Sequence, residues 1–443
     1  MRSSLPWAII AAFLGFVIWR NGRNSRNILV PTPDLPDGYY AEGPHKKHCT
    51  IIRDTPSDSM NYCEDAAFWE RVDGSGAVFD KVMLLSCDPS RKSWNTVMGP
   101  LSDPSSRGAL WIYDIANADA QPQQITLEGY PEGHDFHPLG LDIYPSQPNE
   151  PYSNLFVVNH ARHNSTIEQF TALVASAQPR KLVAPNALAL TSPTSFYLTH
   201  DHRFTRRLPG VLGKTLPVIE SILALPLAWV THVTLTDTDA TTTTTTTTTT
   251  VPPLQPATTT HTEIVASRIP FPNGVAISPD GTQVAIASTT LGEILFYTRD
   301  IATQALSLRA RVPTPFAPDN IMFDERGSLI VAGHPYFQAL VAVAANSTGA
   351  RAPSWVVSIT PSPTPPGAGA ETDAWDVGVP VPASRKVPRV PGYEMRTLYQ
   401  SDGSEFSSSS TALRDARTGM LYVVGLYQGG MMVCSPMKLG ISW

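Results

Sequence analysis

Residues 273–287, which read NGVAISPDGTQVAIA, indicate the fold more clearly than any other stretch of the chain. Apolar residues alternate with small or polar ones on both sides of P-D-G at 279–281. Such alternation is typical of β-strands, and a short Gly-containing turn between two alternating runs predicts a β-hairpin. We therefore expect antiparallel strands at 273–278 and 283–287.

Hairpins of this kind recur at a fixed spacing. Strand starts at positions 139 and 186 (186 − 139) and at 273 and 320 (320 − 273) both lie 47 residues apart. A repeat of about 40–50 residues is typical of β-propeller blades. β-Sandwiches also contain alternating strands, but the fixed period and the Asn or Asp before the first strand favour a propeller. The sequence predicts an all-β, six-bladed β-propeller over residues 45–436, and its length also allows five or seven blades.

Two stretches interrupt the strand pattern. Residues 236–260 contain a continuous threonine tract at 241–250, and low-complexity polar sequence of this kind cannot bury a core. Residues 358–382 are rich in Pro, Gly and Ala. Both stretches are predicted to be insertions outside the regular blades.

Composition agrees with this fold and argues against one class of partner. The chain has 41 prolines and only 16% charged residues, which favours many turns and few long helices. Its net charge is −6, whereas a nucleic-acid-binding surface needs clustered Lys and Arg. We expect no nucleic-acid partner.

The N-terminus carries an apolar run at residues 7–19 (WAIIAAFLGFVIW). This length matches the apolar region of a signal peptide and falls short of the roughly 20 residues of a spanning helix. Because no A-x-A-like cleavage site follows, residues 1–26 are predicted to be either a signal peptide or a signal-anchor, with a stalk at 27–44. The expected location is the secretory pathway, as a secreted protein or one held to a membrane through this segment.

Signals for orientation across that membrane conflict. The arginines that follow the apolar run, at 20, 23 and 26, would stay cytosolic under the positive-inside rule. Two sequons, at Asn164 and Asn346, instead predict glycosylation in the secretory lumen. The four cysteines form no C-x-x-C pair, and their even number after a secretory-type segment favours disulfides over four free thiols.

Oxygen-bearing side chains recur where the first strands of several predicted blades begin. These residues are Glu64, Asp65, Asn186, Asn273, Asp319 and Asn320. The first strands of propeller blades surround a central channel, so these side chains should converge at one end of it. Asn and Asp also start strands simply as turn residues, but a set in register across blades favours a metal site. Oxygen ligands suit calcium and disfavour zinc or copper.

A series of short motifs runs in one order along nearly the whole predicted propeller. They are C-E-D at 63–65, V-V-N-H at 157–160 followed by S-T-x-E, P-N-A at 185–187, F-Y-L-T-H-D-H at 196–202, L-A-W at 227–229, F-P-N-G-V-A-I-S-P-D-G at 271–281, P-D-N at 318–320, G-H-P at 333–335 and the last cysteine, Cys434. Each motif alone is weak, but the ordered series resembles the serum paraoxonase/arylesterase family, in a fungal-type form. The resemblance implies a six-bladed propeller with two calcium ions in its channel.

The resemblance also implies which residues hold the two ions. For the catalytic calcium it implies Glu64, Asn186, Asn273, Asp319 and Asn320. For a second, structural calcium it implies Asp65 and the backbone carbonyl of Leu141. The family's other aspartate for that ion falls at Ala187, so we expect one firmly bound calcium and a weak or missing second one.

Only half of the family's histidine pair above the catalytic metal is present. One member matches His160, and the other falls at Leu139, which cannot carry a proton. His134 and His137 lie nearby but out of register, and a shifted strand start would let His137 substitute. By the same resemblance, His334 and Leu139 are expected to line the substrate pocket.

The resemblance implies hydrolysis of carboxylic esters or lactones, with calcium polarising the carbonyl and water attacking it. The water would be activated by His160 or by Asp319, while Asn186 and Asn273 orient the carbonyl. The chain contains no G-x-S-x-G motif, so an acyl-serine route is not expected. Two alternatives remain: a propeller of the gluconolactonase or strictosidine-synthase type, and a non-catalytic calcium-binding propeller that binds a ligand or partner, which the missing histidine favours.

The same family places a ring-closing disulfide where this chain has Cys49 and Cys434. Such a bond would join the first and last strands of the propeller. Cys63 and Cys87 lie in neighbouring strand segments, and we expect them to form the second bridge.

Overall fold

The computed structural model describes most of the chain between positions 34 and 437. The ranges outside the description are 56, 58, 98, 103–106, 118, 131–132, 147–152, 172–181, 237–257, 363–374, 377 and 438–443, together with 1–33 apart from 8, 11–12 and 15. The predicted signal or anchor segment and the threonine tract therefore lie almost wholly outside the described residues. Within the described ranges, none of the helices combines the length and the apolarity needed to cross a bilayer.

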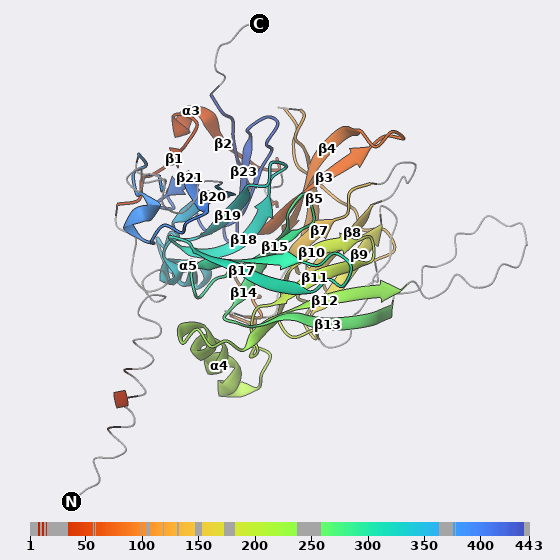
Figure 1. The fold of residues 1–443 in the computed structure, drawn as a ribbon, viewed down its shortest axis with the longest axis vertical. Coiled ribbons are helices and arrows are strands. Elements are labelled where there is room, and N and C mark those ends of the chain that lie inside the picture. Colours follow the sequence, from red (N-terminus) through yellow and green to blue (C-terminus); the bar gives the residue numbers. More distant parts are fainter. Residues whose placement is uncertain are drawn as a thin grey trace, which may run out of the picture.

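The strands of the described residues form six antiparallel sheets (Figure 1). Blade one contains β3 (Cys63–Val72), β4 (Val78–Cys87), β5 (Ala109–Asp114) and β6 (Gln123–Gln124). Blade two contains β7 (Pro138–Ile143), β8 (Asn154–Asn159) and β9 (Thr166–Thr171). Blade three contains β10 (Pro185–Ser192), β11 (Ser195–His200), β12 (Ala228–Thr236) and β13 (Thr258–Ile269).

The second half of the chain repeats this arrangement. Blade four contains β14 (Pro272–Ile277), β15 (Gln283–Ser288), β16 (Glu293–Arg299) and β17 (Leu306–Pro313). Blade five contains β18 (Ala317–Phe323), β19 (Leu329–His334), β20 (Ser354–Pro361), β21 (Tyr393–Ser401) and β1 (Tyr39–Tyr40). Blade six contains β22 (Ser409–Arg414), β23 (Leu421–Gly425), β24 (Met431–Cys434) and β2 (Cys49–Ile52).

The first strands of the six blades form a closed ring. Each of β3, β7, β10, β14 and β18 contacts the first strand of the next blade, and β22 contacts β3. The predicted six-bladed propeller is confirmed. The helices lie outside this ring, with α3 at His45–His48, α4 at Gly210–Ile222 and α5 at Phe337–Ala344, and Figure 1 shows α4 standing apart from the sheets.

The N-terminal strands join the last two blades. Strand β2 pairs with β24 as the outer strand of blade six, and β1 is the outer strand of blade five. Cys49 lies opposite Cys434 in the β2–β24 ladder, and the two are disulfide-bonded. Cys63 and Cys87 form the second disulfide, between β3 and β4. Both predicted bridges are confirmed.

The hydrophobic core is divided among the interfaces between blades. One cluster of buried side chains fills each of the six interfaces between neighbouring sheets. In β10, for example, Ala187 and Ala189 pack toward blade four, whereas Leu188 packs toward blade two. Successive side chains of a strand point to opposite faces of the sheet. A sheet that is buried on both faces therefore needs apolar residues at successive positions, not only at every second one.

The two predicted insertions are narrower than the sequence pattern suggested. Strand β20 continues to Pro361, and Thr236 and Thr258 belong to β12 and β13. Trp375, inside the predicted loop 358–382, is 2% exposed and packs in the cluster between blades four and five. A single aromatic anchor in a Pro- and Gly-rich stretch leaves no periodicity, so the sequence pattern could not reveal it.

A buried histidine in blade three should make the fold sensitive to acid. His200 is 3% exposed, contacts the Val183 carbonyl oxygen at 2.7 Å, and stacks on Trp229. Burial lowers its pKa to about 4 from 6.5. Because the unfolded chain binds the proton first, the stabilising contribution is present above pH 6.5 and is lost as pH falls toward 4.

We therefore expect His200→Gln to remove part of this pH dependence. The free energy of unfolding of the wild type should fall between pH 7.5 and pH 4.5 by up to about 3 kcal/mol more than that of the variant. Urea unfolding at both pH values measures this difference. His261→Gln, at an exposed histidine, is the control, and equal pH dependence of wild type and His200→Gln would contradict the prediction.

Candidate active site

All six inner strands depart from regular pairing at the same point. In each blade, the pairing register between the first and second strands shifts near the start of the first strand. The shifts lie at 63/65, 138/141, 185/188, 272/275, 318/321 and 409/411. The residues skipped by these shifts include Glu64, Leu139, Asn186, Asn273, Asp319 and Asn320. β-Bulges re-aim side chains, and proline suits the first strand position because it has no N–H to pair.

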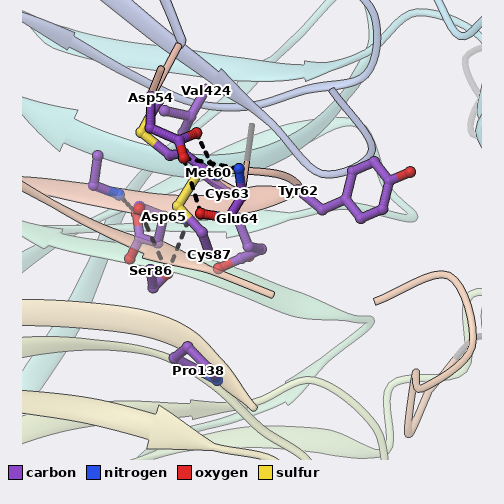
Figure 2. Close-up of a disulfide and its surroundings, with 12 residues drawn as sticks. Asp54, Met60, Tyr62, Cys63, Glu64, Asp65, Ser86, Cys87, Pro138 and Val424 are labelled. Atoms are coloured by element: carbon purple, nitrogen blue, oxygen red, sulfur yellow. Dashed lines mark hydrogen bonds between the residues drawn. A yellow bond between two sulfur atoms is a disulfide. The ribbon is translucent and has the colours of Figure 1, made fainter. Parts of the chain in front are cut away.

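These shifts bring most of the predicted site residues to one cavity. Seven of them line it: Glu64, Leu139, His160, Asn186, Asn273, Asp319 and His334. Asn320 lines an adjacent cavity with Asp65 and Leu141, and its side-chain nitrogen reaches back to Glu64 Oε1 at 2.9 Å. The predicted set thus occupies two neighbouring layers of the channel. Figure 2 shows Glu64 and Asp65 directly beside the Cys63–Cys87 disulfide.

Hydrogen bonds link the amide and carboxylate side chains of the cavity. Asn273 Nδ2 donates to Asp319 Oδ1 at 2.5 Å, and Asn186 Nδ2 donates to Asp201 Oδ2 at 3.4 Å. His334 Nε2 lies 2.9 Å from Asp319 Oδ2. Four of the predicted calcium ligands each have a buried oxygen without a hydrogen-bond partner among the described residues: Glu64 Oε2, Asn186 Oδ1, Asn273 Oδ1 and Asn320 Oδ1. Leaving buried acceptors unpaired costs about 1–3 kcal/mol each, so a ligand for them is expected.

The electrostatics of the cavity also favour a cation. Burial raises the pKa of Glu64 well above its usual range, and repulsion from Asp65 and Asp319 adds to this rise. Burial likewise raises the pKa of Asp65, to about 6. A cation near these carboxylates would favour their charged forms.

The donor set fits a hard cation better than zinc. It consists of the carboxylates of Glu64 and Asp319 and three amide oxygens, which are calcium-type ligands. Across the described part of the chain, no three His, Cys, Asp or Glu side chains are grouped to hold a metal. Amide oxygens make up most of this set, and only two of its members are carboxylates.

Comparison with known proteins finds similarity to arylesterases. The arylesterase family model matches residues 99–240. Serum paraoxonase/arylesterase 1 from Homo sapiens is 26% identical over 257 residues, which cover 56% of this chain and 61% of the relative. The corresponding protein from Mus musculus is 26% identical over 244 residues, covering 53% and 59%. The chain is similar to members of the serum paraoxonase/arylesterase family.

The match to these paraoxonases is partial, since it spans about three fifths of their length. Among solved structures, a gluconolactonase from Xanthomonas campestris aligns with a TM-score of 0.38 at 12% identity, covering 91% of this chain and 98% of that one.

Asp65, which the paraoxonase resemblance assigns to a second calcium, is engaged in hydrogen bonds. Asp65 Oδ1 accepts from the Ala66 amide at 2.9 Å and from Thr411 Oγ1 at 3.0 Å, and Oδ2 accepts from the Leu141 amide at 2.9 Å. Ala187 offers only a methyl group. Asp65 therefore ties β3 to β7 and β22, and a weak or missing second calcium stays a prediction.

His160, predicted as a catalytic base from the paraoxonase motif, has both ring nitrogens engaged. Nε2 lies 2.7 Å from the Pro185 carbonyl oxygen, which can only accept, so Nε2 carries the proton. Nδ1 lies 2.9 Å from Thr96 Oγ1. Burial lowers the pKa of His160 to about 3. This geometry does not support the predicted base role; His160 instead fixes the start of β10, which carries Asn186.

Leu139 and His334, the two residues predicted to line the substrate pocket, both lie at the cavity. Leu139 packs between blades two and three and lines the cavity, and His334 orients Asp319. The cavity residues that the sequence missed include Asp88, Arg91 and Trp94, which lie between β4 and β5. No spacing rule points to them, because this segment is irregular. Both sequon residues, Asn164 and Asn346, are exposed, and their glycosylation stays a prediction.

Proposed function

We propose that this protein is a calcium-dependent hydrolase of carboxylic esters or lactones. The four unpartnered buried oxygens that converge on one channel in the described structure carry this proposal. The relation to the paraoxonases adds independent support. One calcium ion would be held by Glu64, Asn186, Asn273, Asp319 and Asn320.

Bound there, calcium would act as a Lewis acid on the substrate carbonyl and stabilise negative charge on its oxygen. The protein's part is to hold the ligands rigidly. Asp319 is fixed on both oxygens, by Asn273 and by His334, and Glu64 is fixed by Asn320. Leu139, Phe271, Phe337, Leu340 and Leu426 form the apolar part of the lining, which would receive the organic part of the substrate and exclude water.

The proposed location is the secretory pathway, with the protein secreted or anchored through its N-terminal segment. Two disulfides in the structure support an oxidising compartment. The engaged nitrogens of His160 favour a second candidate, a calcium-binding propeller without catalysis.

Hydrolysis assays separate the two candidates. Purified protein should cleave phenyl acetate and small lactones in the presence of calcium. The activity should disappear with a chelator and return when calcium, but not magnesium, is restored in excess. If calcium raises Tm but the calcium-loaded protein hydrolyses neither substrate, the non-catalytic candidate is favoured. If hydrolysis is unchanged by chelator, the proposed role of calcium is contradicted.

The proposal of a single ion makes Ala187 a test position. Ala187→Asp should create a second, weak calcium site, because it restores the charged ligand that the family has there. Calorimetric titration should give one ion for the wild type and two for the variant, the second with a Kd in the roughly 10⁻⁴–10⁻³ M range of weak calcium modules. Ala187→Asn, of the same shape without the charge, should bind one ion. Two ions in the wild type would overturn the prediction.

A further inference from the structure

A buried histidine–carboxylate pair lines the cavity without belonging to the proposed calcium ligands. His137 Nδ1 lies 3.0 Å from Asp88 Oδ2, and the two side chains are 2% and 1% exposed. His137 precedes β7, and Asp88 follows β4, so the pair joins blades one and two. Both residues line the same cavity as Glu64 and Asp319.

Both members of the pair are held on several sides. The His137 amide donates to Asn159 Oδ1 at 2.8 Å, and the His137 ring lies 5.9 Å from the Trp94 ring. Asp88 Oδ1 accepts from the Ser90 amide at 2.9 Å, which leaves Oδ2 for the histidine. The ring of His137 is therefore fixed at its backbone, at Nδ1 and on one face.

The hydrogen bond to Asp88 decides the tautomer of His137. A carboxylate accepts, so Nδ1 carries the proton and the lone pair of the neutral ring is on Nε2. Nε2 is buried and has no hydrogen-bond partner in the described parts of the chain. A buried basic nitrogen of this kind, backed by a carboxylate, is the arrangement of a general base.

The other histidines of the cavity are committed elsewhere. Both nitrogens of His160 are engaged by Thr96 and Pro185. The partner of His334 is Asp319, a proposed calcium ligand, so His334 positions that ligand. Among the cavity residues that the structure describes, only His137 combines a free ring nitrogen with a carboxylate outside the proposed calcium set.

We infer that His137, positioned by Asp88, is the general base of this site and compensates for the leucine at 139. This inference rests on the proposed ester or lactone hydrolysis. His137 Nε2 takes a proton from water as the water oxygen bonds to the carbonyl carbon, and the carbonyl π electrons move onto oxygen. When the tetrahedral intermediate collapses, the bond to the leaving oxygen breaks, and His137 returns the proton to that oxygen. The products are a carboxylic acid and an alcohol, or one hydroxy acid from a lactone.

The pH dependence of kcat/KM for phenyl acetate tests this role. A histidine base works only when neutral, so the wild-type rate should rise with pH through one ionisation. His137→Gln should lose about 10²–10⁴-fold of kcat/KM together with that acid limb. Asp88→Asn removes a charge that favours the imidazolium, so its acid limb should move to lower pH. A purely structural role would not move the limb.

Control variants separate this result from misfolding and from loss of metal. His134→Gln removes a histidine of the same loop that also contacts a carboxylate, Glu168, at 3.1 Å. His134 does not line the cavity, so this variant should keep the acid limb of the wild type. His137→Gln should keep the calcium-induced rise in Tm. If the wild type is active and His137→Gln keeps both its rate and its acid limb, the base assignment is overturned while the hydrolase proposal stands. If the calcium-loaded wild type hydrolyses nothing, both fall.

Discussion

Glu64→Gln is expected to abolish calcium-dependent hydrolysis and the calcium-induced rise in Tm. The change keeps the size of the side chain but removes one of two carboxylates from the proposed ligand set. Its Oε2 is one of the buried oxygens without a hydrogen-bond partner in the described structure, so the calcium ion would lose both a ligand and half of the compensating charge. We expect a loss of at least about 10³-fold in kcat, comparable to the removal of a strong electrostatic stabiliser.

Without bound metal, the same substitution should not lower Tm. Burial and two neighbouring carboxylates raise the pKa of Glu64, so its charged form is costly at neutral pH when no ion is bound. Protonated Glu64 avoids this cost, so its favourable contribution to folding is present at low pH. This contribution is lost as pH rises through the raised pKa. In chelator at pH 7.5, Glu64→Gln should therefore melt no lower than the wild type, whereas in calcium it should melt lower.

Differential scanning calorimetry with and without chelator measures both effects. Glu263→Gln, at an exposed carboxylate, should leave Tm and activity unchanged in both conditions. A Glu64→Gln variant that keeps its activity, or that melts lower than the wild type in chelator by the same amount as in calcium, would contradict the assigned role.

Loss of the ring-closing disulfide should be the largest change in stability. The Cys49–Cys434 bond closes a loop of 385 residues in sequence separation. In the chain-entropy model a loop of this length stabilises by about 6 kcal/mol, of the order of the whole net stability of many domains. The double variant Cys49→Ser/Cys434→Ser should lose this amount in urea unfolding at pH 7.5.

The second disulfide supplies a matched comparison. Cys63 and Cys87 are separated by only 24 residues, so Cys63→Ser/Cys87→Ser should lose about 3 kcal/mol in the same model. A smaller loss for the 49/434 pair than for the 63/87 pair would show that the β2–β24 ladder closes the ring without help from the covalent bond.

The sequence predicted those features that repeat from blade to blade. Pro185-Asn186, Pro272-Asn273 and Pro318-Asp319 recur at the start of inner strands, so oxygen-bearing side chains at these strand starts could be found from the sequence, whereas the bulges beside them were not predicted. The channel geometry then follows from the propeller, because the same strand position of every blade faces the axis.

Features that depend on contacts between unrelated loops could not be predicted. Asp88 and His137 meet only because the segment after β4 folds over the start of β7. The engagement of His160 by Thr96 depends on the same segment. For this reason a motif match could place His160 in the cavity but could not show that both of its ring nitrogens are engaged. Strands β1 and β2 likewise pair with strands near the other end of the chain, which local sequence patterns do not reveal.

Calcium titration of chelator-treated protein by isothermal calorimetry tests the central claim most directly. Four buried oxygens without hydrogen-bond partners in the described chain point to one cation in the channel. The account predicts one ion bound per chain by the wild type, a higher Tm when the ion is bound, and no binding by Glu64→Gln. No measurable binding by the wild type together with an unchanged Tm would contradict it.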